Sequence, residues 1–428
     1  MTATAPDAMT EWRRHVMLPI AAALGYACSV IHIYGLGPFI APISAEFGWT
    51  RAEVTFGLTI STVISAVFCI PIGILVDRFG PRRLGLVGCL LMLGTFSLLG
   101  TATGELWNWY LLWVVLSLGT IFVQATIWTA AVSSRFERAR GLALAIALSG
   151  ASIGATVFPP LATWLIETYG WQQAVAYEAA IWAAVTFPVL LLFFRGARDR
   201  GASPGPTDAP VQAVQGGVTL PEAFHSSVFW RLFAASMMFT VTIIALQVHF
   251  VPVLTDGGAA PMAAAGIAAL VGIFSIIGRL GTGFLLDRFR GSRVGALVFL
   301  LPAFGCLLLL YGEADTLALS VAAALIGLTL GSEIDVIAYL TSRYFGLKHF
   351  GALYGAMLVA LSMGTATGPL AAAAVFDSQG SYAPFLWLTI ALMLGSSLAL
   401  ATLPHPTYGA DVHAVPGDLA HDGPPPLD

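Results

Sequence analysis

One cation stands inside a segment that is otherwise apolar. Residues 272–286 read GIFSIIGRLGTGFLL, and Arg279 lies seven residues into this run. A charged side chain at membrane depth costs at least about 2.5 to 3.5 kcal/mol, so it usually faces a polar cavity and marks a functional site. The planar guanidinium also matches a carboxylate in a bidentate geometry. Arg279 is therefore predicted to bind a small organic acid.

Two carboxylates are predicted to lie near this arginine. Arg279 precedes Asp287 by eight residues and Asp335 precedes Arg343 by eight. At about 1.5 Å per residue, Arg279 and Asp335 are both about 12 Å from one membrane edge. Glu333 and Asp335 point about 200° apart on a helix, so they cannot both face one cavity. We expect one carboxylate to partner Arg279 without substrate and to take up a proton when substrate arrives. The alternative is a permanent buried ion pair between the two helices.

Three further polar residues are candidates for the substrate path. His249 belongs to a side-chain type that titrates near physiological pH, and it lies toward one end of the apolar run 229–254. Gln124 and Tyr26 fall near the middle of their own apolar runs. Each of these side chains either lines a cavity or forms a hydrogen bond to a neighbouring helix. The residues alone leave both interpretations open.

The composition identifies an integral membrane protein. Hydrophobic residues occupy 57% of the 428 positions, charged residues occupy only 10%, and the mean hydropathy is +0.84. One soluble core could not bury so much apolar surface, whereas lipid solvates it. The sequence therefore predicts an all-α membrane protein with twelve transmembrane helices. Their approximate spans are 17–42, 54–76, 84–102, 107–134, 141–167, 172–195, 229–254, 262–286, 294–312, 316–342, 351–376 and 382–403.

Polar stretches divide the chain into two halves. We predict an N-terminal tail (1–16), a first six-helix half (17–195), a Gly- and Pro-rich linker (196–228), a second half (229–403) and a disordered tail (404–428). Every Lys and Arg except Arg51 and Arg279 falls on the side of both tails and the linker. By the positive-inside rule this side is cytoplasmic. We therefore expect a multi-pass protein of the cytoplasmic (inner) membrane with both termini inside.

The two halves repeat one loop sequence. Residues 73–83 read GILVDRFGPRR and residues 283–293 read GFLLDRFRGSR, each just after an even-numbered helix on the basic side. Two six-helix repeats in parallel orientation are typical of transporters that bind substrate between the halves and expose it alternately to the two sides. The repeat therefore predicts a pseudo-symmetric transporter.

These loops also carry groups that could tie helices together. Glycine permits close helix approach, and an aspartate pairs with a cation or accepts from the amides at a helix N-terminus. We expect the loops to latch the outward-facing state. The alternative is that their charges only set the topology. The predicted latch residues are Gly73, Asp77, Arg78, Arg82, Asp287 and Arg288.

Over essentially its whole apolar length the chain resembles the major facilitator superfamily. Residues 73–83 fit the superfamily loop Gly-x-Leu-x-Asp-Arg-x-Gly-x-Arg-Arg at every position. Residues 46–53, 138–154 and 331–346 look like the bacterial monocarboxylate and oxalate-formate porters. This resemblance implies that Arg279 binds the substrate carboxylate and that His249 lines the substrate path. Animal members place an aspartate one turn before this arginine and a lysine on helix one, whereas this chain has Ser275 and no lysine there.

Motifs of other protein classes are missing from the sequence. It has no nucleophile elbow, phosphate-binding loop or metal-ligand spacing, and its four cysteines all lie in apolar runs. We therefore expect no enzyme, no metal or cofactor, and no nucleic-acid partner. The leading prediction is a monomeric secondary transporter that moves small monocarboxylates with proton symport. The alternatives are an anion exchanger, a drug efflux antiporter or a carboxylate sensor without transport.

Overall fold

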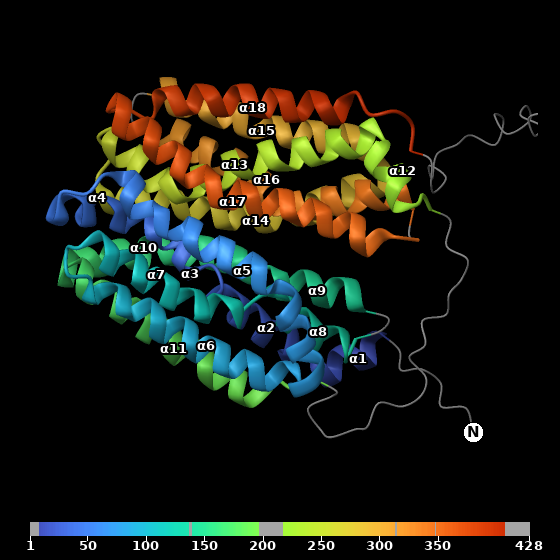
Figure 1. The fold of residues 1–428 in the computed structure, drawn as a ribbon, viewed down its shortest axis with the longest axis horizontal. Coiled ribbons are helices and arrows are strands. Elements are labelled where there is room, and N and C mark those ends of the chain that lie inside the picture. Colours follow the sequence, from blue (N-terminus) through green and yellow to red (C-terminus); the bar gives the residue numbers. More distant parts are fainter. Residues whose placement is uncertain (1–7, 137–138, 197–216, 313–314, 347, 407–428) are drawn as a thin grey trace, which may run out of the picture.

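The chain folds into two groups of helices. The computed structural model describes residues 8–136, 139–196, 217–312, 315–346 and 348–406, and almost all of them are helical. Figure 1 shows the two groups side by side. The first group contains α1 (Ala8–His15), α2 (Met17–Cys28), α3 (Ile31–Tyr34), α4 (Leu36–Phe47), α5 (Arg51–Phe79), α6 (Pro81–Ser97), η1 (Leu98–Thr101), α7 (Leu106–Ile121), α8 (Ala125–Ser133), α9 (Arg140–Leu148), α10 (Gly150–Tyr169) and α11 (Trp171–Phe193). The second group contains α12 (Leu220–His225), α13 (Ser227–Asp256), α14 (Pro261–Arg288), α15 (Gly291–Tyr311), α16 (Thr316–Phe345), α17 (Phe350–Gln379) and α18 (Ala383–Ala401).

Within the described residues, eleven helical spans are long and apolar enough to cross a membrane. The first apolar segment is different because it consists of the shorter helices α2, α3 and α4. The apolar run 17–42 predicts a single membrane helix there, whereas the structure has three shorter ones. The Ser29 hydroxyl donates to the carbonyl of Tyr26 (2.7 Å) just where α2 ends, and Gly35 separates α3 from α4. Side-chain bonds of this kind compete with the backbone pattern of a continuous helix.

The long helices extend a few residues beyond the predicted apolar runs. Helix α5 begins at Arg51, three residues before the predicted start, because Thr50 and Glu53 form a capping box. The Thr50 N–H donates to the Glu53 carboxylate (2.8 Å), and the Glu53 N–H donates to the Thr50 hydroxyl (3.2 Å). Polar residues thus satisfy the free amides of the first turn and set the helix boundary.

Two short helices fall within the predicted tail and linker. Glu11 of α1 accepts a hydrogen bond from the backbone N–H of Ala139 (3.1 Å), which holds α1 against the start of α9. Helix α12 is capped by Thr219 and Glu222, and hydrogen bonds from Thr219 lower the pKa of Glu222. Both helices lie at the same end of the bundle, which we call the tail end; the opposite end is the α4 end (Figure 1).

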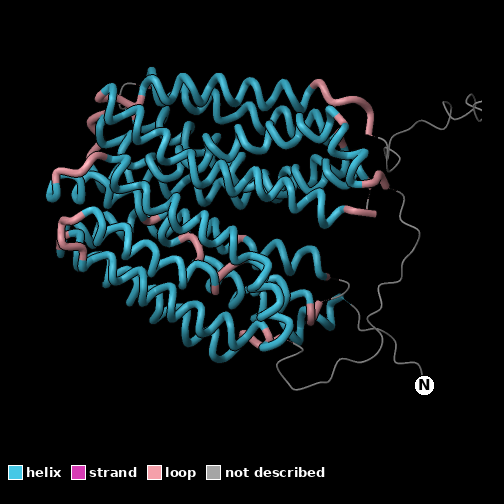
Figure 2. The backbone as a smooth tube through the Cα atoms, viewed as in Figure 1, coloured by secondary structure: helices cyan, strands magenta, loops and turns pink. Residues whose placement is uncertain are grey.

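The two halves meet through α5 with α17, α10 with α14, and α4 with α13. Glycines permit this approach, because a Cβ at Gly272 would overlap Thr156 of α10 and a Cβ at Gly37 would lie 2.5 Å from the carbonyl oxygen of Val248. Figure 2 shows that most loops lie at the two ends of the bundle, while a few interrupt helices of the first half within it. Two of these interruptions, between α2 and α3 and between α9 and α10, adjoin residues that line the cavity described next.

Candidate functional site

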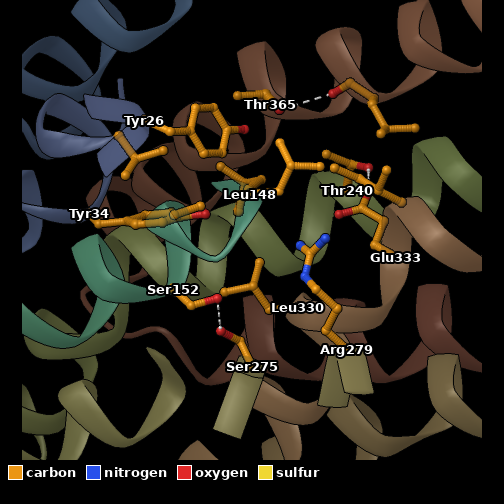
Figure 3. A pocket seen from close by; sticks show the side chains of 15 residues that line it. Tyr26, Tyr34, Leu148, Ser152, Thr240, Ser275, Arg279, Leu330, Glu333 and Thr365 are labelled. Atoms are coloured by element: carbon orange, nitrogen blue, oxygen red, sulfur yellow. Dashed lines mark hydrogen bonds between the residues drawn. The ribbon is translucent and has the colours of Figure 1, made fainter. Parts of the chain in front are cut away.

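A cavity of about 210 Å³ lies between the two halves (Figure 3). Both halves contribute to its wall, and the side chains include one cation, one carboxyl group and two phenols. From the first half it is lined by Tyr26, Val30, Tyr34, Leu148, Ala151 and Ser152. From the second half it is lined by Thr240, Ile244, Ser275, Arg279, Leu330, Glu333, Ile334, Leu361 and Thr365.

Arg279 of α14 directs its guanidinium group into this cavity (Figure 3). Its side chain is only 11% exposed, and its Nη1 lies 3.8 Å from Oδ2 of Asp335 on α16. That distance is an ion contact but is too long for a hydrogen bond. Its Nε has no hydrogen-bond partner among the described residues. The guanidinium therefore retains donors for a bound anion.

The two predicted coupling carboxylates occupy different positions around α16. Glu333 is buried, lines the cavity and accepts a hydrogen bond from the Thr240 hydroxyl of α13 (2.5 Å). Asp335 is not part of the lining, but its side chain is 36% exposed and lies beside Arg279. One carboxyl thus faces the cavity and the other faces the cation, as expected from their spacing. Their roles in proton coupling remain predictions.

Two tyrosines from the first half face Arg279 across the cavity (Figure 3). Tyr26 of α2 was a candidate from the sequence, whereas Tyr34 of α3 was not. Tyr34 lies beyond the break between α2 and α3, so helical spacing counted from Tyr26 does not place it at the cavity. The wall is also joined across the halves, since the Ser275 hydroxyl donates to the Ser152 hydroxyl (2.6 Å).

The candidates His249 and Gln124 are not among the residues that line the cavity. His249 is buried in α13, where its Nδ1 lies 2.7 Å from the Tyr382 hydroxyl and its Nε2 lies 2.9 Å from the Pro369 carbonyl oxygen. The side-chain amide of Gln124 donates to the Ser65 carbonyl of α5 (3.0 Å). Both side chains join neighbouring helices in this structure, and a role for either in substrate binding stays a prediction.

Arg51, the first residue of α5, binds the second half at the α4 end. Its guanidinium donates to both carboxylate oxygens of Asp256 (2.8 and 3.1 Å) and to the Tyr382 hydroxyl (2.9 Å). The backbone N–H groups of Arg51 and Ala52 donate to the two carboxylate oxygens of Asp377 (2.9 and 2.8 Å). A carboxylate of the second half thus caps a helix of the first half. We call Arg51, Asp256, Asp377 and Tyr382 the Arg51 cluster.

The predicted latch residues lie near the tail end. Gly73 and Asp77 belong to α5, but their side-chain positions fall outside the described part of the structure. Arg82 of α6 donates to the Leu191 carbonyl of α11 (2.8 Å). Asp287 is exposed, and the Arg288 guanidinium lies 4.0 Å from the centre of a neighbouring aromatic ring. The guanidinium of Arg78 lies 5.4 Å from the ring of the next residue, so the latch itself remains a prediction.

Metal binding would need a different set of side chains. Within the described ranges, no group of three or more His, Cys, Asp or Glu side chains is arranged to hold a metal ion. The chemistry of the cavity is therefore that of one guanidinium, one carboxyl, several hydroxyls and apolar side chains. Such a set can bind and orient an anion.

Comparison with known proteins identifies the family. Residues 22–331 match the family model for the Major Facilitator Superfamily, and the chain belongs to this superfamily. It is therefore a multi-pass membrane transporter, and the predicted fold of two six-helix halves is confirmed.

Individual relatives are more distant. The chain is 27% identical over 405 residues to monocarboxylate transporter 13 of Bos taurus, covering 94% of this chain and 91% of that protein. It is 23% identical over 365 residues to the 4-hydroxybenzoate transporter PcaK of Pseudomonas putida, covering 76% and 81%. Among solved structures, a bacterial homologue of the human lysosomal transporter Spinster, inward-facing and occupied, is similar with a TM-score of 0.63 at 15% identity, covering 93% and 96%.

Proposed function

We propose that this protein carries a small organic monocarboxylate across the membrane together with a proton. The observation that carries this proposal is the Arg279 guanidinium, which lies in a cavity between the two halves and retains donors for an anion. In transporters built from two parallel repeats, a site at this position is exposed alternately to the two sides. A monocarboxylate supplies the planar pair of oxygens that a guanidinium binds best.

The rest of the cavity suits a substrate with an apolar body. The cavity is also lined by aliphatic side chains such as Leu148, Leu330 and Ile334. A carboxylate bound at Arg279 would place its hydrocarbon part against these residues. A volume of about 210 Å³ suits a short chain or a single ring. The relatives named for monocarboxylates and 4-hydroxybenzoate support this range of substrates.

The position of Asp335 beside the cation supports the proposed proton coupling. Without substrate, the Arg279 guanidinium compensates the charge of Asp335 across 3.8 Å. A substrate carboxylate on Arg279 would compete for this compensation, and a poorly compensated carboxylate at membrane depth favours proton uptake. Glu333, which lines the same cavity, is the second candidate for this proton.

Substitution of Arg279 tests the proposed function. In proteoliposomes with an imposed pH gradient, Arg279→Ala should lose nearly all carboxylate uptake, and Arg279→Lys should retain only a part because an ammonium lacks the planar fork. The matched control is Arg14→Ala, an exposed arginine of α1 that does not line the cavity. Wild-type uptake by the Arg279→Ala protein would refute the proposal.

The same vesicles separate symport from exchange. A symporter accumulates substrate when only a pH gradient is imposed, whereas an exchanger needs counter-substrate inside the vesicle and no gradient. Binding without flux in both arms would identify a sensor. A thermal-shift screen of mono-, di- and aromatic carboxylates against the purified protein would identify the acid used in these assays.

A further inference from the structure

A carboxyl group that the proposed mechanism does not use is buried in the first half. Glu178 of α11 is 0% exposed, and neither of its carboxylate oxygens has a hydrogen-bond partner among the described residues. Burial of an ionised carboxylate without a partner is so unfavourable that such a group is neutral instead. The geometry around Glu178 therefore requires a bound proton in this conformation.

Glu178 is the first of three buried polar residues on one face of α11. Trp182 and Thr186 follow at intervals of four residues, so all three share a helix face. The indole Nε1 of Trp182 and the hydroxyl of Thr186 are also buried without hydrogen-bond partners in the described chain. Trp182 packs against Phe158 of α10 (5.0 Å between ring centres), so this face points into the first half and not toward lipid.

The carboxyl group lies against the break in the first membrane segment. A Cβ built on Gly35, which separates α3 from α4, would lie 3.2 and 3.6 Å from the two carboxylate oxygens of Glu178. The same Cβ would lie 2.6 Å from the carbonyl oxygen of Ile31, so the backbone at this break favours glycine. The preceding residue, Tyr34, lines the substrate cavity. One turn of helix thus touches the cavity on one side and Glu178 on the other.

We propose that Glu178 is a proton-binding site that is linked to substrate binding through the turn α3. This inference rests on the proposed proton symport and assigns a further residue to it. Glu178 holds its proton while Gly35 covers the carboxyl group. Its release requires α3 to move, so that water reaches the carboxylate. Substrate bound against Tyr34 acts on the same turn, and the two ligands therefore influence each other's affinity.

Two other titratable groups lie on elements near this site. His32 of α3 is buried against Trp113 of α7, with 6.2 Å between the ring centres, and its Nδ1 has no hydrogen-bond partner among the described residues. Glu46, at the end of α4, accepts hydrogen bonds from the Trp171 indole (2.5 Å) and the Gln172 amide (2.6 Å). No ion pair joins a described cation to Glu178.

The test compares Glu178→Gln with the wild-type protein in proteoliposomes. With one proton per substrate, a pH difference of one unit drives up to about tenfold accumulation. The glutamine is permanently neutral, so its accumulation ratio should fall to about one, while counterflow of labelled substrate at equal pH should stay within about twofold of wild type. Glu167→Gln, at an exposed carboxyl of α10, is the matched control and should accumulate substrate normally.

A second measurement does not depend on transport. pH-difference infrared spectroscopy of the purified wild-type protein should show the carbonyl band of a protonated carboxylic acid, and the Glu178→Gln protein should lack it. Full proton-driven accumulation by Glu178→Gln, or an unchanged band, would overturn the inference. If the glutamine variant is not recovered as stable protein, Glu178→Asp takes its place. The shorter acid should shift the pH midpoint of transport, and an unchanged midpoint would overturn the inference.

Companion variants separate this inference from the proposed coupling at Arg279. If Asp335→Asn and Glu333→Gln keep full accumulation while Glu178→Gln loses it, the coupling assigned to the cavity fails and the Glu178 site stands. If Glu178→Gln keeps full accumulation while the cavity variants lose it, the role assigned to Glu178 fails and the coupling assigned to Asp335 and Glu333 stands. Loss of counterflow in Arg279→Ala, measured in parallel, reports on substrate binding alone.

Discussion

Tyr26 and Tyr34 place two polar hydroxyl groups in the cavity, opposite Arg279 (Figure 3). Their hydroxyls form no hydrogen bond with another described residue, so they are free to bind a ligand. If a carboxylic acid bound at Arg279 carries a hydroxyl at its far end, that hydroxyl would meet the two tyrosines. The tyrosines are thus expected to discriminate between hydroxylated acids and their unsubstituted analogues, since an unpaired polar group disfavours the wrong ligand.

Tyr34→Phe tests this discrimination. A neutral hydrogen bond contributes about 0.5 to 1.5 kcal/mol, so affinity for a hydroxylated acid should fall about two- to tenfold. Affinity for the analogue without the hydroxyl should not change. Competition of labelled substrate by the two acids measures both values. Tyr311→Phe, at an exposed tyrosine outside the cavity, is the control. Equal losses for both acids would contradict this role for Tyr34.

At the scale of elements, the contact between α10 and α14 depends on the absence of one side chain. A Cβ at Gly272 would overlap the Thr156 side chain and lie 2.5 Å from the Ser152 carbonyl oxygen, both on the facing helix. Near this contact, the Ser275 hydroxyl donates to the Ser152 hydroxyl across the halves. The two helices therefore pack closely beside the cavity that they help to form.

Gly272→Ala should consequently destabilise the protein by about 1 to 3 kcal/mol, the usual cost of overpacking. The matched substitution is Gly281→Ala on the same helix, where a Cβ would meet no atom within 4 Å. Because alanine favours helix more than glycine does, this control should be neutral or stabilising. Thermal unfolding of both variants in detergent measures the difference. The same unfolding temperature for the two would mean that α10 and α14 do not need this close contact.

At the scale of the whole molecule, hydrogen bonds join the halves at the α4 end and beside the cavity. The Arg51 cluster lies at the α4 end, and the Thr59 hydroxyl of α5 donates to the Ala366 carbonyl of α17 (2.5 Å). In a transporter that rocks one half on the other, contacts at one end favour the conformation closed at that end. The Arg51 cluster should therefore stabilise the conformation described here.

Asp256→Asn measures the contribution of this cluster. Charge-assisted hydrogen bonds contribute about 1.5 to 3 kcal/mol, so their loss should raise the population open at the α4 end by about tenfold or more. Thr103→Cys and Gln379→Cys place spin labels at exposed positions in the two halves. Opening at the α4 end would appear as longer distances between the two labels. Glu105→Gln, at another exposed carboxylate, is the control. An unchanged distance distribution would show that the cluster does not hold the halves together.

Much of the architecture could be predicted from the sequence, because a helix that crosses lipid needs an apolar run of about 20 residues. Apolar runs of membrane length and the repeated loop at Asp77 and Asp287 were sufficient for the spans and the two halves. Their equal distance from a charged edge also predicted that Arg279 and Asp335 could be neighbours, and Nη1 of Arg279 lies 3.8 Å from Oδ2 of Asp335. Helical spacing and distance from a charged edge are local quantities, so they can be counted along the chain.

The remainder depends on how helices rotate and pack. The breaks around α3 were not predicted, because serine and glycine also occur inside continuous membrane helices. Without the break at Gly35, neither Tyr34 at the cavity nor Glu178 behind it could be placed. For His249 and Gln124, depth along the helix was compatible with the cavity, but it could not show which way the side chains point. Both side chains form hydrogen bonds to neighbouring helices.

The ion pair between Arg51 and Asp256 makes buffer composition an experimental variable for this protein. The side chains are 12% and 36% exposed, so dissolved ions reach one flank of the pair. The Debye length falls from about 10 Å at 0.1 M ionic strength to about 3 Å at 1 M, which weakens partly exposed pairs. High salt should therefore increase the population that is open at the α4 end, even when substrate and pH are fixed. Apparent substrate affinities measured at different salt concentrations would then differ because the conformational populations differ.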